Sequence, residues 1–178
     1  FSIGPVSLYS FGAMLALAFL AASAVLVRNL EHRGLDGDWA GPITWRAVLG
    51  GVLGARLLSV VNHWDLFLAD PVGQLFTGAG FVFFGGLAGG LVAVSIWIYR
   101  QRLSWLMMAD TIAPSIVLGQ AIGRIGCQLA GDGDWGTVTT LPWGMAYPDA
   151  IFGWSHSPGV FVHPAPVYES LLYAVIFV

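Results

Sequence analysis

The chain has 178 residues, of which 57% are hydrophobic and 10% are charged, and its formal net charge is −3. A soluble domain carries about 25% charged residues, so this chain has too few polar side chains to cover a water-facing surface. Its seven basic residues are all arginines and form no basic patch, so nothing points to a nucleic-acid partner. The composition indicates an integral membrane protein.

The first apolar segment has no charged side chain from Phe1 to Val27, which exceeds the roughly 20 residues needed to cross a bilayer. A secretory signal peptide has a basic start and a shorter apolar core. Here the basic residues Arg28 and Arg33 follow the apolar block. We therefore expect a retained membrane helix.

Four more apolar segments follow, and three of them carry distinctive residues. The second contains Arg56, the third is rich in glycine, and the fourth carries Asp110. The five expected segments cover about residues 6–27, 47–61, 81–99, 106–122 and 164–178. The sequence thus predicts an all-α, polytopic transmembrane helix bundle forming a single domain, residues 1–178. The last apolar run is too short to span a bilayer, so we expect the protein to continue beyond it.

The arginines predict the orientation of these segments. They cluster in the connections after the first and third segments, whereas the connection 62–79 has none and the polar loop 124–163 has only Arg124. Arginine-bearing connections stay in the cytoplasm. We expect the amino terminus and the loop 124–163 to lie on the outer side of the membrane.

Glycines recur at short spacing, above all from Gly85 to Gly90 in the third segment. In lipid, small residues let helix backbones approach closely, and tight helix packing is a sufficient explanation for most of these glycines. The run in the third segment could also admit lipid or substrate to the backbone. Arg56 and Asp110 leave two readings open as well: they pair with each other or cap helices, or they contact substrate.

Arg124 ends the fourth apolar segment beside turn-forming glycines. Its planar fork can donate two hydrogen bonds to one anion, so it is a candidate phosphate ligand at the outer interface. Asp132 and Asp134 could orient it or act as a base. The alternative is an ordinary snorkelling arginine with acids that end a helix. The Asp-Gly-Asp-Trp sequence at 132–135 lacks the further ligands of a calcium loop, so we expect no metal site.

The segment from His163 to Glu169 closes the loop and opens the last apolar segment. Proline suits a first helical turn, and Glu169 near a helix start interacts favourably with the helix dipole. A capping role is sufficient for these residues, and membership of a site for His163, Tyr168 and Glu169 is the alternative.

Six motifs in a fixed order carry a resemblance to a known family. They are Phe1-Ser-Ile-Gly-Pro-Val, Gly54-Ala-Arg-Leu, Phe83-Phe-Gly-Gly-Leu-Ala-Gly-Gly, Ala109-Asp-Thr-Ile-Ala-Pro, Gly123-Arg-Ile-Gly and His163-Pro-Ala-Pro-Val-Tyr-Glu. Each motif alone is weak. Together, and with the expected topology, they make the chain resemble the prolipoprotein diacylglyceryl transferase family almost from end to end.

The resemblance implies a multi-pass enzyme of the bacterial inner membrane, with phosphatidylglycerol and prolipoprotein signal peptides as its partners. The lipobox cysteine sulfur attacks the glycerol carbon that bears the phosphate, a thioether forms, and glycerol phosphate leaves. No metal or organic cofactor is implied. The reaction needs an arginine for the leaving phosphate and a group that takes the thiol proton, because the thiolate is the nucleophile.

The same resemblance assigns roles to individual residues. Arg124 matches the signature arginine, Asp132 falls where the family has a carboxylate, and Asp132 or Glu169 assists the reaction. Arg56 and Asp110 are expected as structural polar residues in the membrane. The expected substrate-binding residues are Arg124, Gly85, Gly86, Gly126, Gly136, His163 and Tyr168.

Three departures from the family pattern leave a second function open. Phe84 stands where the family commonly has a histidine, Phe11 where it has a tyrosine, and Cys127 where it has an asparagine. Phenylalanine can neither accept a proton nor donate a hydrogen bond. The alternative to the transferase is therefore a catalytically impaired, lipid-binding subunit of a larger membrane complex. A transporter is a weaker third hypothesis, because one acid and one base in the membrane are thin support for it.

Overall fold

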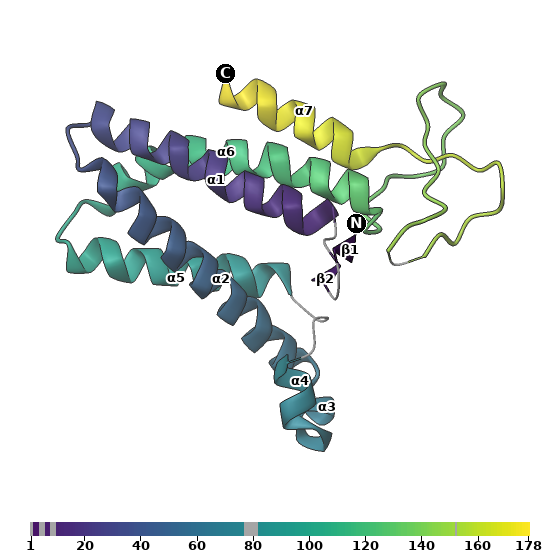
Figure 1. The fold of residues 1–178 in the computed structure, drawn as a ribbon, viewed down its shortest axis with the longest axis horizontal. Coiled ribbons are helices and arrows are strands. Elements are labelled where there is room, and N and C mark those ends of the chain that lie inside the picture. Colours follow the sequence, from purple (N-terminus) through teal and green to yellow (C-terminus); the bar gives the residue numbers. More distant parts are fainter. Residues whose placement is uncertain (1, 4–5, 8–9, 77–81, 152) are drawn as a thin grey trace. The chain divides into compact units, whose positions relative to one another are not determined.

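The computed structural model describes residues 2–3, 6–7, 10–76, 82–151 and 153–178, and their regular structure is helical apart from one two-stranded hairpin (Figure 1). The four long helices are α1 (Ser10–His32), α2 (Ala40–Asn62), α5 (Phe83–Arg100) and α6 (Trp105–Ala130). The short elements are β1 (Ser2–Ile3), β2 (Val6–Ser7), η1 (Gly37–Trp39), α3 (Trp64–Ala69), α4 (Pro71–Phe76) and α7 (Ala165–Phe177).

The all-helical, multi-pass fold class predicted from the sequence is confirmed. Four helices are long and apolar enough to cross a membrane, and α7 is a shorter apolar helix. Two features differ from the apolar pattern. α6 continues past Ile122 to Ala130, so Arg124 lies inside a helix and the polar loop starts at Gly131. The connection 62–79 holds α3 and α4, and the Asp70 carboxylate accepts a hydrogen bond from Gly73 N–H (2.9 Å) in the first turn of α4.

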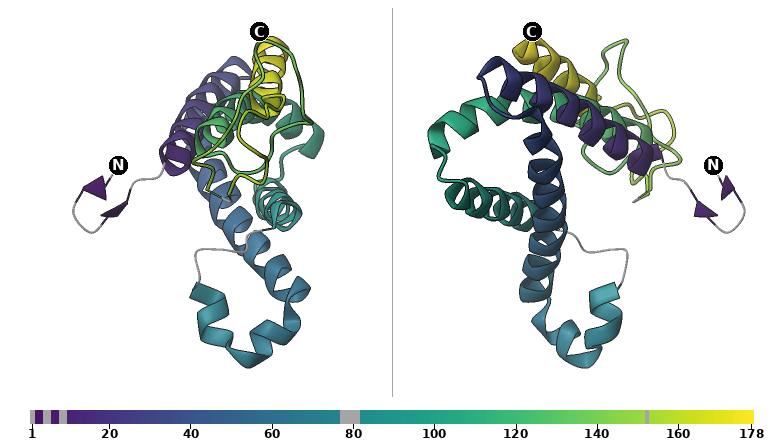
Figure 2. Two further views of the ribbon diagram at one scale, coloured as in Figure 1. Left: turned by 90° about the vertical axis from the view of Figure 1, so that its right-hand side faces the viewer. Right: turned by 60° about the vertical axis from the view of Figure 1, so that its left-hand side comes forward.

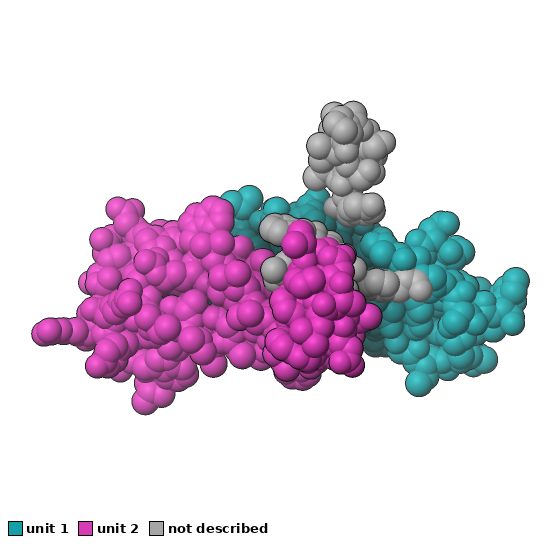
Figure 3. Space-filling model, turned by 90° about the horizontal axis from the view of Figure 1, so that it is seen from below, with its two compact units in different colours: residues 1–26, 112–178 teal, residues 27–111 magenta. Residues whose placement is uncertain are grey.

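The chain divides into two compact units, coloured separately in Figure 3: residues 27–111 form one, and residues 1–26 with 112–178 form the other. In the unit 27–111, α2 and α5 pack directly against each other (Figure 2). A methyl group on Gly54 would lie 2.2 Å from the Gly85 carbonyl oxygen, and one on Gly89 would lie 2.2 Å from the Gly50 carbonyl oxygen. The two backbones therefore touch, as the packing explanation of the glycines requires.

The expected membrane charges Arg56 and Asp110 both belong to the unit 27–111, in different surroundings. Arg56 is buried on α2, one residue after Ala55, whose carbonyl accepts a hydrogen bond from Val82 N–H (3.3 Å). Asp110 is exposed on α6. At Thr111 the α6 carbonyl accepts a hydrogen bond from the Asn29 side chain of α1 (3.0 Å).

In the other unit, α6 contacts both α1 and α7. Gly126 faces α1, where a methyl group would lie 3.0 Å from Met14 Cβ. On the α7 side, the Ser170 hydroxyl donates a hydrogen bond to the Ala121 carbonyl (2.8 Å). These contacts fix α6 between its two neighbours, with its last two turns leading into the outer loop.

The glycine contact between α2 and α5 gives a first prediction. Gly54→Ala should lower the free energy of unfolding of the purified protein by about 1–3 kcal/mol. The new methyl group would meet backbone atoms of α5, and these can move away only if the helix moves with them. Thermal unfolding in detergent micelles, followed by circular dichroism, measures the loss. Gly41→Ala in the same helix is the matched control, since nothing lies within 4 Å of its added methyl group. Equal effects of the two substitutions would contradict the packing role.

Candidate active site

Arg124 is the centre of an ion-pair cluster in the unit formed by residues 1–26 and 112–178. Its Nε contacts the Glu169 carboxylate at the start of α7 (2.5 Å), and its Nη1 contacts the Asp134 carboxylate in the loop after α6. The arginine side chain is 25% exposed, against 55% for Asp134 and 41% for Glu169. One guanidinium thus joins α6, the outer loop and α7.

The turn that follows α6 sets the position of the two loop carboxylates. Gly131 closes the helix with a left-handed φ of 61°, and Gly133 adopts a φ of 93°. Between them, the Asp132 carboxylate accepts a hydrogen bond from Asp134 N–H (3.3 Å). Two glycines in conformations that other residues rarely adopt therefore bring Asp134 back toward the helix that it follows.

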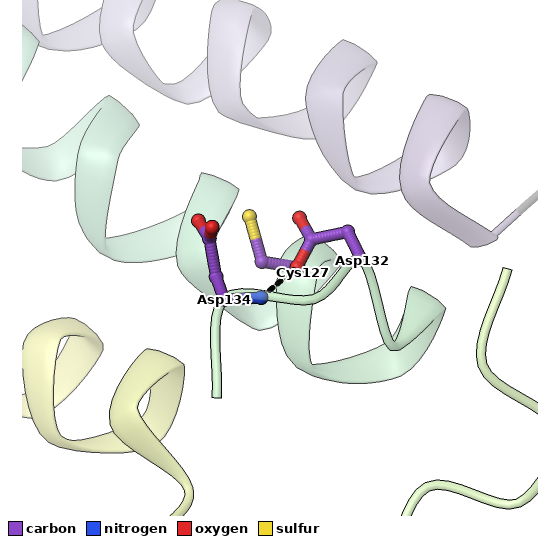
Figure 4. A group of neighbouring side chains, drawn as sticks. All are labelled: Cys127, Asp132 and Asp134. Carbon is purple, nitrogen blue, oxygen red and sulfur yellow. Dashed lines mark hydrogen bonds between the residues drawn. The ribbon is translucent and has the colours of Figure 1, made fainter. Parts of the chain in front are cut away.

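Cys127 lies one helical turn after Arg124, and its sulfur is 3.7 Å from Arg124 Nη1. The side chains of Cys127, Asp132 and Asp134 point to the same side, with one potential ligand atom from each within 4.8 Å of the others (Figure 4). Such a group could hold a cation. In this structure the Arg124 guanidinium contacts two of its three members, so the positive charge at this cluster comes from the protein itself.

A hydrogen-bonded chain of side chains flanks the ion pairs. Trp143 Nε1 donates to the Tyr168 hydroxyl (2.8 Å), which lies 3.0 Å from His163 Nδ1. Because an indole can only donate, the Tyr168 oxygen accepts there and its own proton can go to His163. Neutral His163 then carries its proton on Nε2. The His163 backbone bonds to Gly136 and Thr137. These two residues closely follow the turn that holds Asp132 and Asp134, which we call the acidic turn.

Three aromatic side chains of the polar loop pack against one another. Trp135 stacks on Tyr147 with ring centroids 5.2 Å apart, and Trp154 meets both rings at steeper angles. The Tyr147 hydroxyl donates to Gln128 of α6 (2.9 Å). Burial raises the pKa of Tyr147, because the surroundings disfavour the charged phenolate.

The structure brings together most of the residues that the sequence singled out. Arg124 and Glu169 are in contact, with Asp132, His163 and Tyr168 in the same unit. Two of the expected glycines are also in this unit: Gly126 faces α1, and a methyl group on Gly136 would lie 2.9 Å from His163 Cβ. The expected residues in the other unit are Gly85, Gly86, Arg56 and Asp110.

Two of the residues that differ from the family pattern, Phe11 and Phe84, lie in different units. Phe11 on α1 lies beside Gly126, since a methyl group there would be 3.4 Å from its ring, whereas Phe84 is 72% exposed on α5. The sequence did not single out Gln128, Tyr147 or Trp143. The density of aromatic residues in an otherwise polar loop was the signal available for the latter two.

Comparison with known proteins supports the resemblance. The family model described as prolipoprotein diacylglyceryl transferase matches residues 1–178. Three curated relatives, each named phosphatidylglycerol–prolipoprotein diacylglyceryl transferase, come from Clostridium tetani, Xanthomonas campestris and Thermosynechococcus vestitus. They are 34%, 33% and 32% identical to this chain over 96%, 99% and 95% of its length.

The chain belongs to the prolipoprotein diacylglyceryl transferase family. It spans about two thirds of the length of these relatives, namely 67%, 65% and 63%. The family assignment and the four candidate spans together make it part of a multi-pass membrane protein. The GDGDWG turn after α6 supplies the Asp134 carboxylate that contacts Arg124.

The buried tyrosine gives a second prediction. A folded-state pKa above the ordinary value of about 10 means that the stabilising contribution of protonated Tyr147 is complete below that value and is lost as the pH rises above it. Thermal unfolding at about pH 8 and pH 11 should therefore show an alkaline loss of stability in the native sequence. The loss should be smaller in Tyr147→Phe.

Tyr99→Phe is the matched control for this measurement, because Tyr99 is 83% exposed. It should show the same alkaline loss as the native sequence. An undiminished alkaline loss in Tyr147→Phe would contradict the assignment of that loss to Tyr147.

Proposed function

We propose that this family member transfers the diacylglyceryl group of phosphatidylglycerol to the lipobox cysteine of prolipoproteins. The observation that carries the proposal is the partly exposed guanidinium of Arg124, which two carboxylates hold in place. It lies near the outer end of a membrane-spanning helix, by the expected orientation, and is held by carboxylates rather than by lipid-facing apolar groups.

Arg124 retains donors for a phosphate. A guanidinium has five N–H donors, and its two ion pairs use Nε and Nη1. Among the described residues, no hydrogen bond or ion pair involves Nη2. Glu169 on Nε holds the guanidinium from one side, and the Nη1–Nη2 edge carries the remaining donors. This edge can donate two parallel hydrogen bonds to a phosphate.

Part of a lipid's hydrocarbon chain could lie near Arg124. A cavity of about 220 Å³ lies between α6 and α7. Its lining is Ile125, Gln128, Val167, Ser170 and Leu171. Ile125 and Gln128 are close in sequence to Arg124, and Val167 and Ser170 are close to Glu169. An acyl chain in this cavity would leave its headgroup at the guanidinium.

The reaction follows from these positions. The incoming cysteine loses its proton to a carboxylate, and the resulting thiolate attacks the glycerol carbon that carries the phosphate. A C–S bond forms as the C–O bond to the phosphate breaks, and glycerol phosphate leaves with the electron pair. Arg124 stabilises the charge that develops on the leaving phosphate. Asp132 is our candidate for the proton acceptor, since it adjoins Arg124 through Cys127 and Asp134.

A specific observation also supports the second candidate function, a lipid-binding subunit without transferase activity. The Phe11 ring packs against Gly126, two residues from Arg124, where the family commonly provides a tyrosine hydroxyl. An apolar ring at this point removes one hydrogen-bonding group from the site. This alternative predicts lipid binding without transfer, and the following experiment separates the two.

The test is a transfer assay with purified full-length protein, phosphatidylglycerol vesicles and a lipobox peptide, with the thioether product detected by mass spectrometry. Arg124→Gln should lower kcat/KM about 100-fold or more, the scale on which loss of an anion-stabilising donor acts. Arg124→Lys should also lose most activity. A lysine ammonium lacks the planar fork of a guanidinium, so it cannot bind Glu169 on one side and donate two parallel hydrogen bonds to a phosphate on the other. The control is Arg33→Gln, which removes an exposed arginine of the unit 27–111.

Absence of product with the native protein would overturn the transferase proposal. If phosphatidylglycerol still bound and Arg124→Gln abolished that binding, the lipid-binding subunit would be the correct function.

A further inference from the structure

Gln128 lies on α6 four residues after Arg124, so the two side chains occupy neighbouring positions on one face of the helix. It also lines the cavity between α6 and α7. The Ser170 hydroxyl of the same cavity gives its proton to the Ala121 carbonyl (2.8 Å). The other lining side chains are apolar and belong to Ile125, Val167 and Leu171. The hydrogen-bond donors that remain among these five side chains are therefore the N–H groups of Gln128.

Two hydrogen bonds fix the orientation of the Gln128 amide. Its Oε1 lies 2.9 Å from the Tyr147 hydroxyl, and its Nε2 lies 3.1 Å from the Met145 sulfur. A thioether has no proton to give, so the end of the amide that faces Met145 is the nitrogen. The oxygen end then accepts the Tyr147 proton. The acceptor of the amide is thus in use, and its donor end is defined.

The donor end of Gln128 has capacity for a better acceptor than the one it contacts. Nε2 carries two hydrogens, and a thioether sulfur is a weak acceptor. Among the described residues, the contact with Met145 is the one hydrogen bond that Nε2 makes. Gln128 is half-buried, so an N–H without a strong acceptor there loses free energy that a carbonyl oxygen would restore.

A phospholipid offers carbonyl oxygens at a matching separation from its phosphate. The ester groups are attached to the glycerol carbons next to the one that bears the phosphate, whereas four residues of helix separate Arg124 from Gln128 by about 6 Å. A phosphate at Arg124 therefore leaves an ester carbonyl within reach of Gln128. The acyl chain beyond that ester then enters the apolar part of the cavity. The two contacts lie on either side of the glycerol carbon that the thiolate attacks, and so restrict its orientation.

We propose that Gln128 is a specificity residue for the phospholipid, whose Nε2 donates a hydrogen bond to an ester carbonyl of the molecule that Arg124 binds by its phosphate. The inference rests on the proposed function and deepens it, because it names the part of phosphatidylglycerol that is recognised besides the headgroup. Diester lipids are then better substrates than diether lipids with the same headgroup. Tyr147 acts through Gln128, since its proton holds the amide in the required orientation.

The experiment compares phosphatidylglycerol with its diether analogue, which has the same headgroup and chain length but lacks ester carbonyls. Each lipid is presented at equal content in vesicles of diether phosphatidylcholine, with full-length protein and a lipobox peptide. The native protein should use the diester with a kcat/KM about 3–10 times that for the diether, the range expected of one hydrogen bond between uncharged groups.

Two substitutions of Gln128 separate its contact with lipid from its contact with Tyr147. Gln128→Met removes the N–H donors with little change in shape, and the ratio of the two kcat/KM values should fall close to one. Gln128→Glu keeps an oxygen for the Tyr147 proton, but an ionised carboxylate cannot donate. Its ratio should fall to the same value, whereas a residue that merely supports Tyr147 would keep the native ratio in Gln128→Glu.

Gln101→Met is the matched control, because Gln101 is exposed and belongs to the unit 27–111, and its ratio should equal that of the native protein. Gel filtration and circular dichroism check that each variant is folded. If Gln128→Met is unfolded, Gln128→Glu decides, since it keeps the bond to Tyr147. Equal use of the two lipids by the native protein, or a native ratio in the folded Gln128 variants, would overturn the role of Gln128.

Failure of the proposed function has a separate signature, namely no product from either lipid with the native protein. Native mass spectrometry of the protein with the diester and the diether in equal amounts then tests the inference alone. Preferential retention of the diester that is lost in the Gln128 variants supports recognition of the ester without catalysis. Equal retention of both lipids by the native protein contradicts it.

Discussion

The candidate site depends on one guanidinium shared by two carboxylates. Arg124 comes from α6, Glu169 from α7, and Asp134 from the loop between them, so a single side chain ties together three stretches of chain. A lone arginine at the end of a membrane helix would extend toward water and take many conformations. Two carboxylates on different nitrogens remove that freedom and present one edge of the fork. Binding an anion there requires little further ordering of the arginine.

The surroundings of this ion pair reinforce its position. The backbone of Val162 exchanges hydrogen bonds with Met145, and its neighbour His163 bonds to Gly136 and Thr137. Val162 is completely buried, although it lies in an irregular loop. The aromatic group of Trp135, Tyr147 and Trp154 packs over the same region. The polar loop therefore has a small core of its own, built around Val162 and these rings.

The sequence was sufficient for the class of fold, because long charge-free runs have few alternatives to membrane helices. The choice of Arg124 as a site residue rested on the family resemblance, because an arginine at the end of an apolar run can equally extend its side chain toward water. The end of α6 was harder to predict, because Gly123, Arg124 and Gln128 are polar or small residues that also occur in loops. Ile125 and Leu129, four residues apart, continue the apolar face of the helix beyond Ile122.

The sequence alone could not predict which carboxylate of the acidic turn contacts Arg124. Asp132 and Asp134 both follow it within ten residues along the chain, and the family resemblance pointed to Asp132. The choice is made by backbone dihedral angles at Gly131 and Gly133, two residues that can adopt almost any conformation. The stacking of Trp135 on Tyr147 likewise depends on the path of the whole loop. Neither feature has a periodic signal in the sequence.

The contact between α2 and α5 has a mechanical meaning beyond packing. Where carbonyl groups of one helix lie against glycines of the other, rotation of either helix about its own axis would drive side chains into backbone, and sliding would do the same. The pair therefore has one arrangement rather than a range of them. Any displacement of α5 therefore carries α2 with it. The two helices move as one rigid pair, and bending is confined to the segments that connect them to the rest of the chain.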